Sequence, residues 1–307
     1  MAKSGSSGGF RRPRQVVQAA LALLALGAAG CGVSPADTAA APTPTLPRPV
    51  EPTATAPRVA PTATPTPRVC AAREGRVERT AYTSPLLNRA VPVRVALPPC
   101  YDEFEGPLPA VYLLHGLPFS ESQWDLLGAD EAAAARIAAG AWPPVVLVMP
   151  LQPEPLFTQT DGGPGSYEDE MLRGLLPFVE EHYRLDARAE ARALAGISRG
   201  AVWSLSIGLR HPEVFSRVAG LSPALSLNRA RPAYDPLALA AGAGPFPPHL
   251  YLAAGEDDWA RWGTERLSQA LDAAGVEHAW VLSPGGHDSD YWASMLEAVL
   301  DALTAGW

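Results

Sequence analysis

The stretch ARALAGISRG, residues 191–200, decides the fold. Its first seven residues are apolar except for Arg192, and they are predicted to form a buried parallel strand. Residues 201–210 follow as a predicted helix. Between strand and helix, residues 196–200 match G-x-S-x-G, whose small residues permit a sharp turn that exposes the serine hydroxyl above the sheet. The same pentapeptide also fits a tightly packed turn without chemistry, so the role of Ser198 depends on what surrounds it.

Short apolar runs alternate with helical segments on both sides of this unit. Strands are predicted at 110–114, 145–150, 218–222, 250–254 and 280–282, and helices at 130–139, from residue 166, and at 290–303. This alternation predicts an α/β fold with a mostly parallel sheet covered by helices on both faces. Residues 75–83 and 91–97 add an N-terminal antiparallel hairpin, which brings the sheet to about eight strands. Ligands of such sheets bind at the carboxyl ends of the strands.

Loops at that edge contain the partners that a nucleophilic serine needs, a general base and an acid that orients it. His287 follows the strand at 280–282 and is the predicted base, whereas His278 precedes that strand and lies at its wrong end. Three adjacent acids follow the strand at 250–254, and the residues alone leave all three open. They are Glu256, Asp257 and Asp258. A backbone N–H from the loop at 115–118 could join that of Arg199 in holding an oxyanion.

In combination these motifs resemble the α/β-hydrolase family described as "Putative esterase". That family includes enterochelin, feruloyl and acetylxylan esterases, S-formylglutathione hydrolases and mycolyltransferases. The resemblance covers about residues 80–303 and rests on VALPPCY, YLLHG, SYEDEMLRGLLPFVEEHYR, ALAGISRG, GEDD and GGHD. It implies the α/β-hydrolase fold, a catalytic triad of Ser198, Asp258 and His287, and an oxyanion hole made by the N–H groups of Leu117 and Arg199. It implies no metal and no organic cofactor.

The resemblance implies a serine carboxylic-ester hydrolase that works through an acyl-enzyme. Two alternatives remain open, an acyltransferase with the same triad and a non-catalytic surface-binding module on the same scaffold. The substrate is expected to be a small-molecule, carbohydrate or siderophore ester. Arg199 departs from the family pattern, in which Met or a small residue is commoner after the serine. It either favours an anionic group on the substrate or is merely exposed.

Residues 1–31 are predicted to be an export signal. Four basic residues and no acid precede an apolar run at 16–30, which suits a signal peptide but is shorter than the roughly 20 residues of a spanning helix. Small residues then precede Cys31, as in a bacterial lipoprotein signal, where the cysteine becomes the lipid attachment site. We expect a protein exported to the cell envelope and lipid-anchored. The alternatives are ordinary secretion after cleavage near Ala29 and a retained anchor.

Residues 32–69 predict a disordered tether, since 26 of these 38 residues are Pro, Thr or Ala. Residues 70–307 are then the esterase domain. The chain's net charge is −8, but residues 1–69 carry +5, so the domain carries −13. Such an acidic domain repels a phosphate backbone, which excludes nucleic acid as a partner. Lys3 is the only lysine, so the domain cannot form a lysine Schiff base. Membrane contact is expected only through the lipidated N-terminus.

Cysteine usage also fits export. If Cys31 is lipidated, Cys70 and Cys100 remain, and an oxidising compartment allows them to pair. In an antiparallel hairpin with Thr83 opposite Val91, both cysteines fall just beyond the strand ends on the same side. The sequence therefore predicts a Cys70–Cys100 disulfide.

Overall fold

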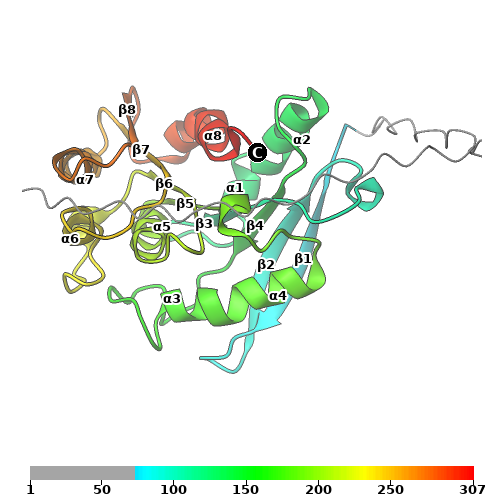
Figure 1. The fold of residues 1–307 in the computed structure, drawn as a ribbon, viewed down its shortest axis with the longest axis horizontal. Helices are drawn as coiled ribbons and strands as arrows, with labels where there is room; N and C mark the ends of the chain where they lie inside the picture. The colour runs from blue at the N-terminus through cyan, green and yellow to red at the C-terminus, as the bar shows by residue number, and fades with distance from the viewer. Residues whose placement is uncertain (1–72) are drawn as a thin grey trace, which may run out of the picture. The chain divides into compact units, whose positions relative to one another are not determined.

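An eight-stranded mixed sheet runs through residues 73–307, the part of the chain that the computed structural model describes (Figure 1). The strands are β1 (Arg76–Thr83), β2 (Ala90–Leu97), β3 (Ala110–Leu114), β4 (Val146–Pro150), β5 (Arg192–Ile197), β6 (Arg217–Leu221), β7 (His249–Gly255) and β8 (Ala279–Ser283). Their order is β1-β2-β4-β3-β5-β6-β7-β8. β2 is antiparallel to β1 and β4, and the other neighbours are parallel. The predicted α/β fold with an N-terminal hairpin is confirmed.

Helices cover both faces of the sheet. They are α1 (Gln123–Leu126), α2 (Ala129–Ala138), α3 (Tyr167–Glu170), α4 (Leu176–His182), α5 (Arg199–Arg210), α6 (Pro236–Ala240), α7 (Arg261–Ala273) and α8 (Ser289–Thr304). A π-helical turn, Met171–Leu175, joins α3 to α4. Buried side chains of α1, α2 and α8 pack in one core, and those of α3, α4, α5 and α7 pack in the other. Figure 1 shows α2 beside α8 on the side of the sheet opposite α3 and α4.

The central strand β3 explains why the sheet holds together. All five of its residues are buried, and they alternate between the two cores. Val111 and Leu113 join the core beneath α2 and α8, whereas Tyr112 and Leu114 join the core beneath α5. This alternation follows from the period of two in a strand, and it makes a strand covered on both faces apolar throughout. Each fully buried Val or Leu side chain contributes about 1.5–3 kcal/mol from burial.

The hairpin register differs by one residue from the expected one. Thr83 pairs with Ala90 rather than with Val91. The Ser84 N–H donates to the Arg89 carbonyl at 2.8 Å, and Asn88 takes a φ of 51°, so the turn closes one residue earlier. Asparagine tolerates this left-handed conformation better than most residues.

Several predictions for the N-terminal part fall outside the described residues. They concern the export signal at 1–31, the tether at 32–69, and the cysteines Cys31 and Cys70. The proposed pairing of Cys70 with Cys100 at the end of β2 therefore stays a prediction. Within residues 73–307, every helix is too short or too polar to cross a membrane.

Candidate active site

The turn between β5 and α5 holds Ser198 in a strained backbone conformation, with φ 54° and ψ −110°. Positive φ is uncommon for a residue with a side chain and costs on the order of 1–3 kcal/mol. Neighbouring backbone holds the turn in place: the Ser198 N–H donates to the Leu221 carbonyl at 2.9 Å, and the Ser198 carbonyl accepts from the Ala224 N–H at 3.1 Å. The strained turn directs the hydroxyl toward the loops that follow β7 and β8.

Close packing explains both glycines of the pentapeptide. A Cβ on Gly196 would lie 2.2 Å from the Gly200 carbonyl oxygen. A Cβ on Gly200 would lie 2.4 Å from the carbonyl oxygens of Leu114 and His115. Real Cβ atoms do not approach backbone oxygens so closely, so both positions require glycine. Tight packing and a serine hydroxyl that points toward His287 are therefore properties of the same turn, and the packing requirement does not argue against chemistry.

The structure brings Ser198, His287 and Asp258 into one hydrogen-bonded chain. His287 Nε2 lies 2.9 Å from Ser198 Oγ, and His287 Nδ1 lies 2.8 Å from Asp258 Oδ1. An ionised Asp258 accepts the Nδ1 proton, which leaves Nε2 free to accept the serine proton. This arrangement can activate a serine hydroxyl as a nucleophile.

Among the three candidate acids, only Asp258 is buried, and Glu256 and Asp257 point to solvent. Burial alone would raise the pKa of Asp258, but three hydrogen-bond donors outweigh it and lower the pKa below its usual value. These donors are His287, the hydroxyl of Ser222 and the N–H of Ala260. Asp258 is therefore ionised at neutral pH and suited to orient His287.

Two tryptophans enclose His287. The Trp259 ring stacks on the imidazole with centroids 4.3 Å apart, and the Trp292 ring meets it edge-on at 5.2 Å. Trp292 Nε1 also donates to Ser222 Oγ at 3.0 Å, which links it to the residue that stabilises Asp258. The position of Trp259 directly after Asp258 was the available sequence signal for a residue at the site, whereas Ser222 and Trp292 carried none.

The loop after β3 lies against the serine. A Cβ on Gly116 would lie 3.2 Å from the Ser198 Cβ, and the Gly116 N–H donates to Gln123 Oε1 at 2.7 Å. Leu117 and Arg199 line the same cavity as Ser198. That the N–H groups of Leu117 and Arg199 form an oxyanion hole stays a prediction.

His115 is the first residue of this loop and is fully buried. Its Nε2 accepts from the Gln152 N–H at 2.9 Å, while the Gln152 side chain donates to the His115 carbonyl at 2.6 Å. Burial lowers the pKa of His115, so the ring is neutral. His115 therefore packs in the interior and also fixes the backbone next to Ser198.

A cavity of about 340 Å³ opens onto Ser198 and His287. Its walls are mainly apolar, with two threonine hydroxyls and one cationic side chain. The lining residues are Leu117, Thr158, Thr160, Ser198, Arg199, Ala224, Leu227, Trp259 and His287. Thr158 and Thr160 come from the loop after β4, and Leu227 from the loop after β6. These loops have no regular pattern, so the sequence did not reveal their place at the site.

Arg199 is neither exposed nor paired with an acid. Only 9% of it is accessible, and its Nε donates to the Phe157 carbonyl at 3.2 Å. Its Nη2 donates to the Gln159 carbonyl, and its guanidinium lies 5.1 Å from the Trp203 ring centroid. The expectation that Arg199 might be merely exposed is wrong, because these carbonyls draw the side chain into the wall of the cavity.

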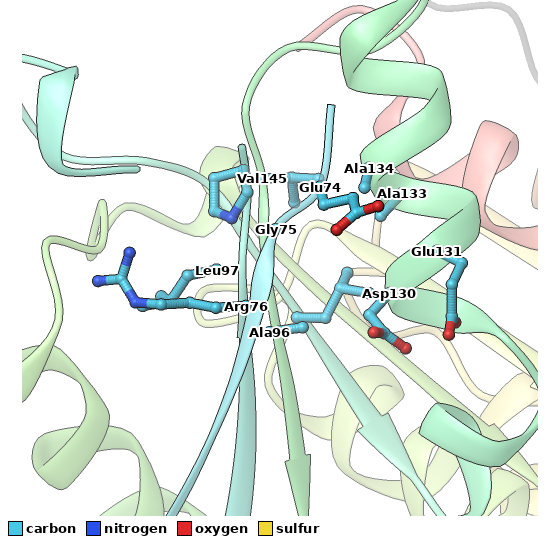
Figure 2. Close-up of a pocket in the computed structure, with 12 residues that line it drawn as sticks. Glu74, Gly75, Arg76, Ala96, Leu97, Asp130, Glu131, Ala133, Ala134 and Val145 are labelled. Carbon is cyan, nitrogen blue, oxygen red and sulfur yellow. The ribbon is translucent and has the colours of Figure 1, made fainter. Parts of the chain in front are cut away.

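A second cavity, of about 330 Å³, lies between β1, β2 and α2, away from the serine (Figure 2). Asp130 and Glu131 reach it from α2, and Figure 2 shows the Arg76 side chain on the opposite side of β1 from these acids. No serine, cysteine or histidine lines it. Of these two cavities, the one at Ser198 is the one lined by a serine and a histidine.

The acids at 168–170 each have protein partners. Glu168 pairs with Arg210 at 2.9 Å and with His211 at 3.0 Å, and Ser84 donates to Glu170 at 2.8 Å. Asp169 pairs with Arg173. Across residues 73–307, no group of three or more acids, histidines or cysteines could hold a metal ion. These acids therefore tie α3 to its neighbours.

Comparisons with known proteins place this chain among esterases. The model of the family described as "Putative esterase" matches residues 84–304. An endo-1,4-beta-xylanase/feruloyl esterase of Xylanibacter ruminicola is 24% identical over 238 residues, which is 75% of this chain and 31% of the relative. Esterase Rv1288 of Mycobacterium tuberculosis is 28% identical over 147 residues, 45% of this chain and 30% of the relative. This chain thus spans about a third of each of these curated relatives.

Solved structures show the same fold. A ferulic acid esterase superposes with a TM-score of 0.67 at 24% identity, covering 75% of this chain and 98% of that one. An S-formylglutathione hydrolase of Staphylococcus aureus gives a TM-score of 0.64 at 20% identity, covering 75% and 99%. A ferulic acid esterase of Anaeromyces mucronatus, solved in complex with ferulic acid, gives 0.61 at 21% identity, covering 75% and 90%.

Proposed function

Because this chain belongs to the "Putative esterase" family, we propose that it is a serine carboxylic-ester hydrolase acting through Ser198, His287 and Asp258. The observation that carries the proposal is the unbroken chain of hydrogen bonds at 2.9 and 2.8 Å from Ser198 Oγ through His287 to Asp258. A strained turn holds the serine, and a mainly apolar cavity opens directly onto it. These features together supply a nucleophile, its base and a place for an ester.

In the proposed reaction, Ser198 Oγ attacks the ester carbonyl while His287 Nε2 takes the hydroxyl proton. The N–H groups of Leu117 and Arg199 hold the oxyanion of the tetrahedral intermediate. The intermediate collapses, the alcohol leaves with the proton from His287, and an acyl-serine remains. His287 then takes a proton from water, whose oxygen attacks the acyl carbon; the acid departs and Ser198 regains its proton. Every group these steps need comes from the protein and water, so no metal or organic cofactor takes part.

The substrate proposed is a small-molecule, carbohydrate or siderophore ester. Structures of related proteins contain ferulic acid or sinapinate, which supports an aromatic or other small acyl group as one possibility to test. The cavity of about 340 Å³ is of a size for such a group.

The proposed setting is the cell envelope, with Cys31 as lipid attachment site, residues 32–69 as a spacer and a Cys70–Cys100 disulfide. Secretion without a lipid is the alternative. The mass of the mature N-terminal peptide tests this: a diacylglyceryl-modified Cys31 supports anchoring, whereas an unmodified N-terminus overturns it.

The decisive test of the reaction is Ser198→Ala with p-nitrophenyl acetate. We expect the turnover number to fall at least about 1,000-fold, because the nucleophile is lost. Ser226→Ala is the matched control, since Ser226 is an exposed serine on the loop after β6. Equal turnover by Ser198→Ala and wild type would refute the proposal. Faster transfer to added alcohols than to water would instead identify an acyltransferase with the same triad.

A further inference from the structure

Arg199 places a cation in the wall of the cavity with no carboxylate in hydrogen-bond contact, and the charge of Glu154 is the acid that acts on it from farther away. Its hydrogen-bond acceptors are the carbonyls of Phe157 and Gln159 and, at 3.5 Å, the amide oxygen of Asn228. Within residues 73–307, no carboxylate forms an ion pair with its guanidinium. Burial lowers the pKa of Arg199 to about 10, which still leaves the side chain charged at neutral pH. Buried cations are costly unless a negative group pairs with them.

The guanidinium also has donors to spare. A guanidinium carries five N–H groups in a planar fork, and the bond from Nη1 to Asn228 at 3.5 Å is at the limit of a hydrogen bond. The other wall residues are apolar, apart from two threonines and the catalytic pair, and none of them is an acid. The lining residues therefore offer an anion one strong partner beside Ser198 and include no acid, although the carboxylate of Glu154 accepts from the lining Thr158 at 2.7 Å.

We propose that Arg199 forms a subsite for a carboxylate, so that the preferred substrates are esters bearing a second, ionised acid group. The inference rests on the proposed esterase activity and names its substrate class. An N–H fork and a carboxylate match in shape, and their charge-assisted bonds are stronger than neutral ones. The esterase domain carries a net charge of −13, so an anionic substrate needs a local cation at the site.

A purely structural role for Arg199 makes a different prediction. If the side chain only ties the loop at 157–159 to α5, its loss disturbs the site for all esters alike. A carboxylate subsite instead changes the preference between charged and neutral esters. The ratio of kcat/KM for the charged ester to kcat/KM for the neutral ester therefore distinguishes the two roles, because a general loss of activity cancels in this ratio.

The test compares matched substrates on the full-length protein. On the acyl side, the mono-p-nitrophenyl ester of adipic acid is compared with p-nitrophenyl hexanoate, and on the alcohol side 4-acetoxybenzoate with phenyl acetate. We expect wild type to favour the carboxylate-bearing ester at least about tenfold in one of these pairs, and that pair shows which half of the substrate reaches Arg199. In Arg199→Met, this preference should fall at least about tenfold. Arg229→Met is the control: it removes an arginine that is exposed, lies outside the cavity lining and bonds to backbone carbonyls, so the preference should stay.

Three outcomes overturn the inference. In the first, wild type hydrolyses the neutral esters through Ser198 without preferring the charged ones, which refutes the carboxylate subsite but not the esterase activity. In the second, Arg199→Met keeps the full preference for charged esters, which shows that other residues cause it. Loss of preference in Arg229→Met to the same degree would make it a general effect of surface charge. Hydrolysis that Ser198→Ala leaves undiminished refutes the esterase proposal itself. If Arg199→Met does not fold, the wild-type ratios still test the proposal, because equal kcat/KM values for charged and neutral esters overturn it.

Discussion

At the scale of single residues, Asp258 fixes which ring nitrogen of His287 carries the proton. Its Oδ1 accepts from His287 Nδ1 at 2.8 Å and from the Ala260 N–H at 2.7 Å. We predict that Asp258→Asn lowers the turnover number by roughly 1,000- to 10,000-fold, because an amide can donate to Nδ1 and stabilise the wrong tautomer of His287. Steady-state kinetics with p-nitrophenyl acetate measure this loss.

Asp257→Asn is the control for that experiment, since it makes the same change at an exposed neighbour. It should retain wild-type turnover. A turnover number for Asp258→Asn within tenfold of wild type would contradict the assigned role.

The sequence alone led to Ser198 and His287, because position at strand ends excludes most competitors. The residues alone did not separate Asp258 from Glu256 and Asp257; the resemblance to the esterase family selected Asp258, and burial in the structure distinguishes it from the other two. The place of the Arg199 side chain could not be predicted either. Its contacts with loop carbonyls come from tertiary packing, which leaves no local pattern in the sequence.

At the scale of elements, the contact between α5 and β3 depends on Gly200. We predict that Gly200→Ala markedly lowers both the melting temperature and the turnover number, because the added methyl would meet two carbonyl oxygens at 2.4 Å. Thermal unfolding and kinetics on purified protein measure both effects.

Gly244→Ala is the matched control, since a Cβ there meets nothing within 4 Å and no positive φ forbids it. It should leave the melting temperature within about 1 °C of wild type. Unchanged stability in Gly200→Ala would mean that the turn can move away from β3.

Each strand lies within one residue of its expected bounds. β3 and β4 were predictable because their apolar runs are continuous, whereas β1 has polar residues throughout and was predicted as one arm of a hairpin. α7 was not predicted. Its buried stripe is Thr264, Leu267, Ser268 and Leu271, so half of the positions that face the core are polar and the helical period is hidden. The hairpin register was missed by one residue because a six-residue turn, not the strand pattern, determines it.

At the scale of the whole molecule, acids outnumber bases, and residues 70–307 carry −13 of a net charge that is −8 for the chain. Burial beside other acids makes some of these carboxylates costly to ionise. Asp130 is the clearest case. Burial raises the pKa of Asp130 from 3.8 to about 7, together with the neighbouring carboxylates of Glu131, to which protonated Asp130 can donate, and of Asp125. The folded protein therefore binds a proton at this site between pH 4 and 7 that the unfolded chain has released.

Stability from this site is accordingly full below about pH 4 and declines as the pH rises through 7. We predict that Asp130→Asn, which cannot ionise, raises the melting temperature by about 2–4 °C at pH 8, equivalent to ~1 kcal/mol after allowing for the partial exposure of the group. The gain should shrink toward zero near pH 4. Asp290→Asn is the matched control, because Asp290 is exposed and holds the same second position in α8 that Asp130 holds in α2. A gain for Asp130→Asn that is constant with pH, or larger at pH 4 than at pH 8, would show that burial does not hold the proton on Asp130.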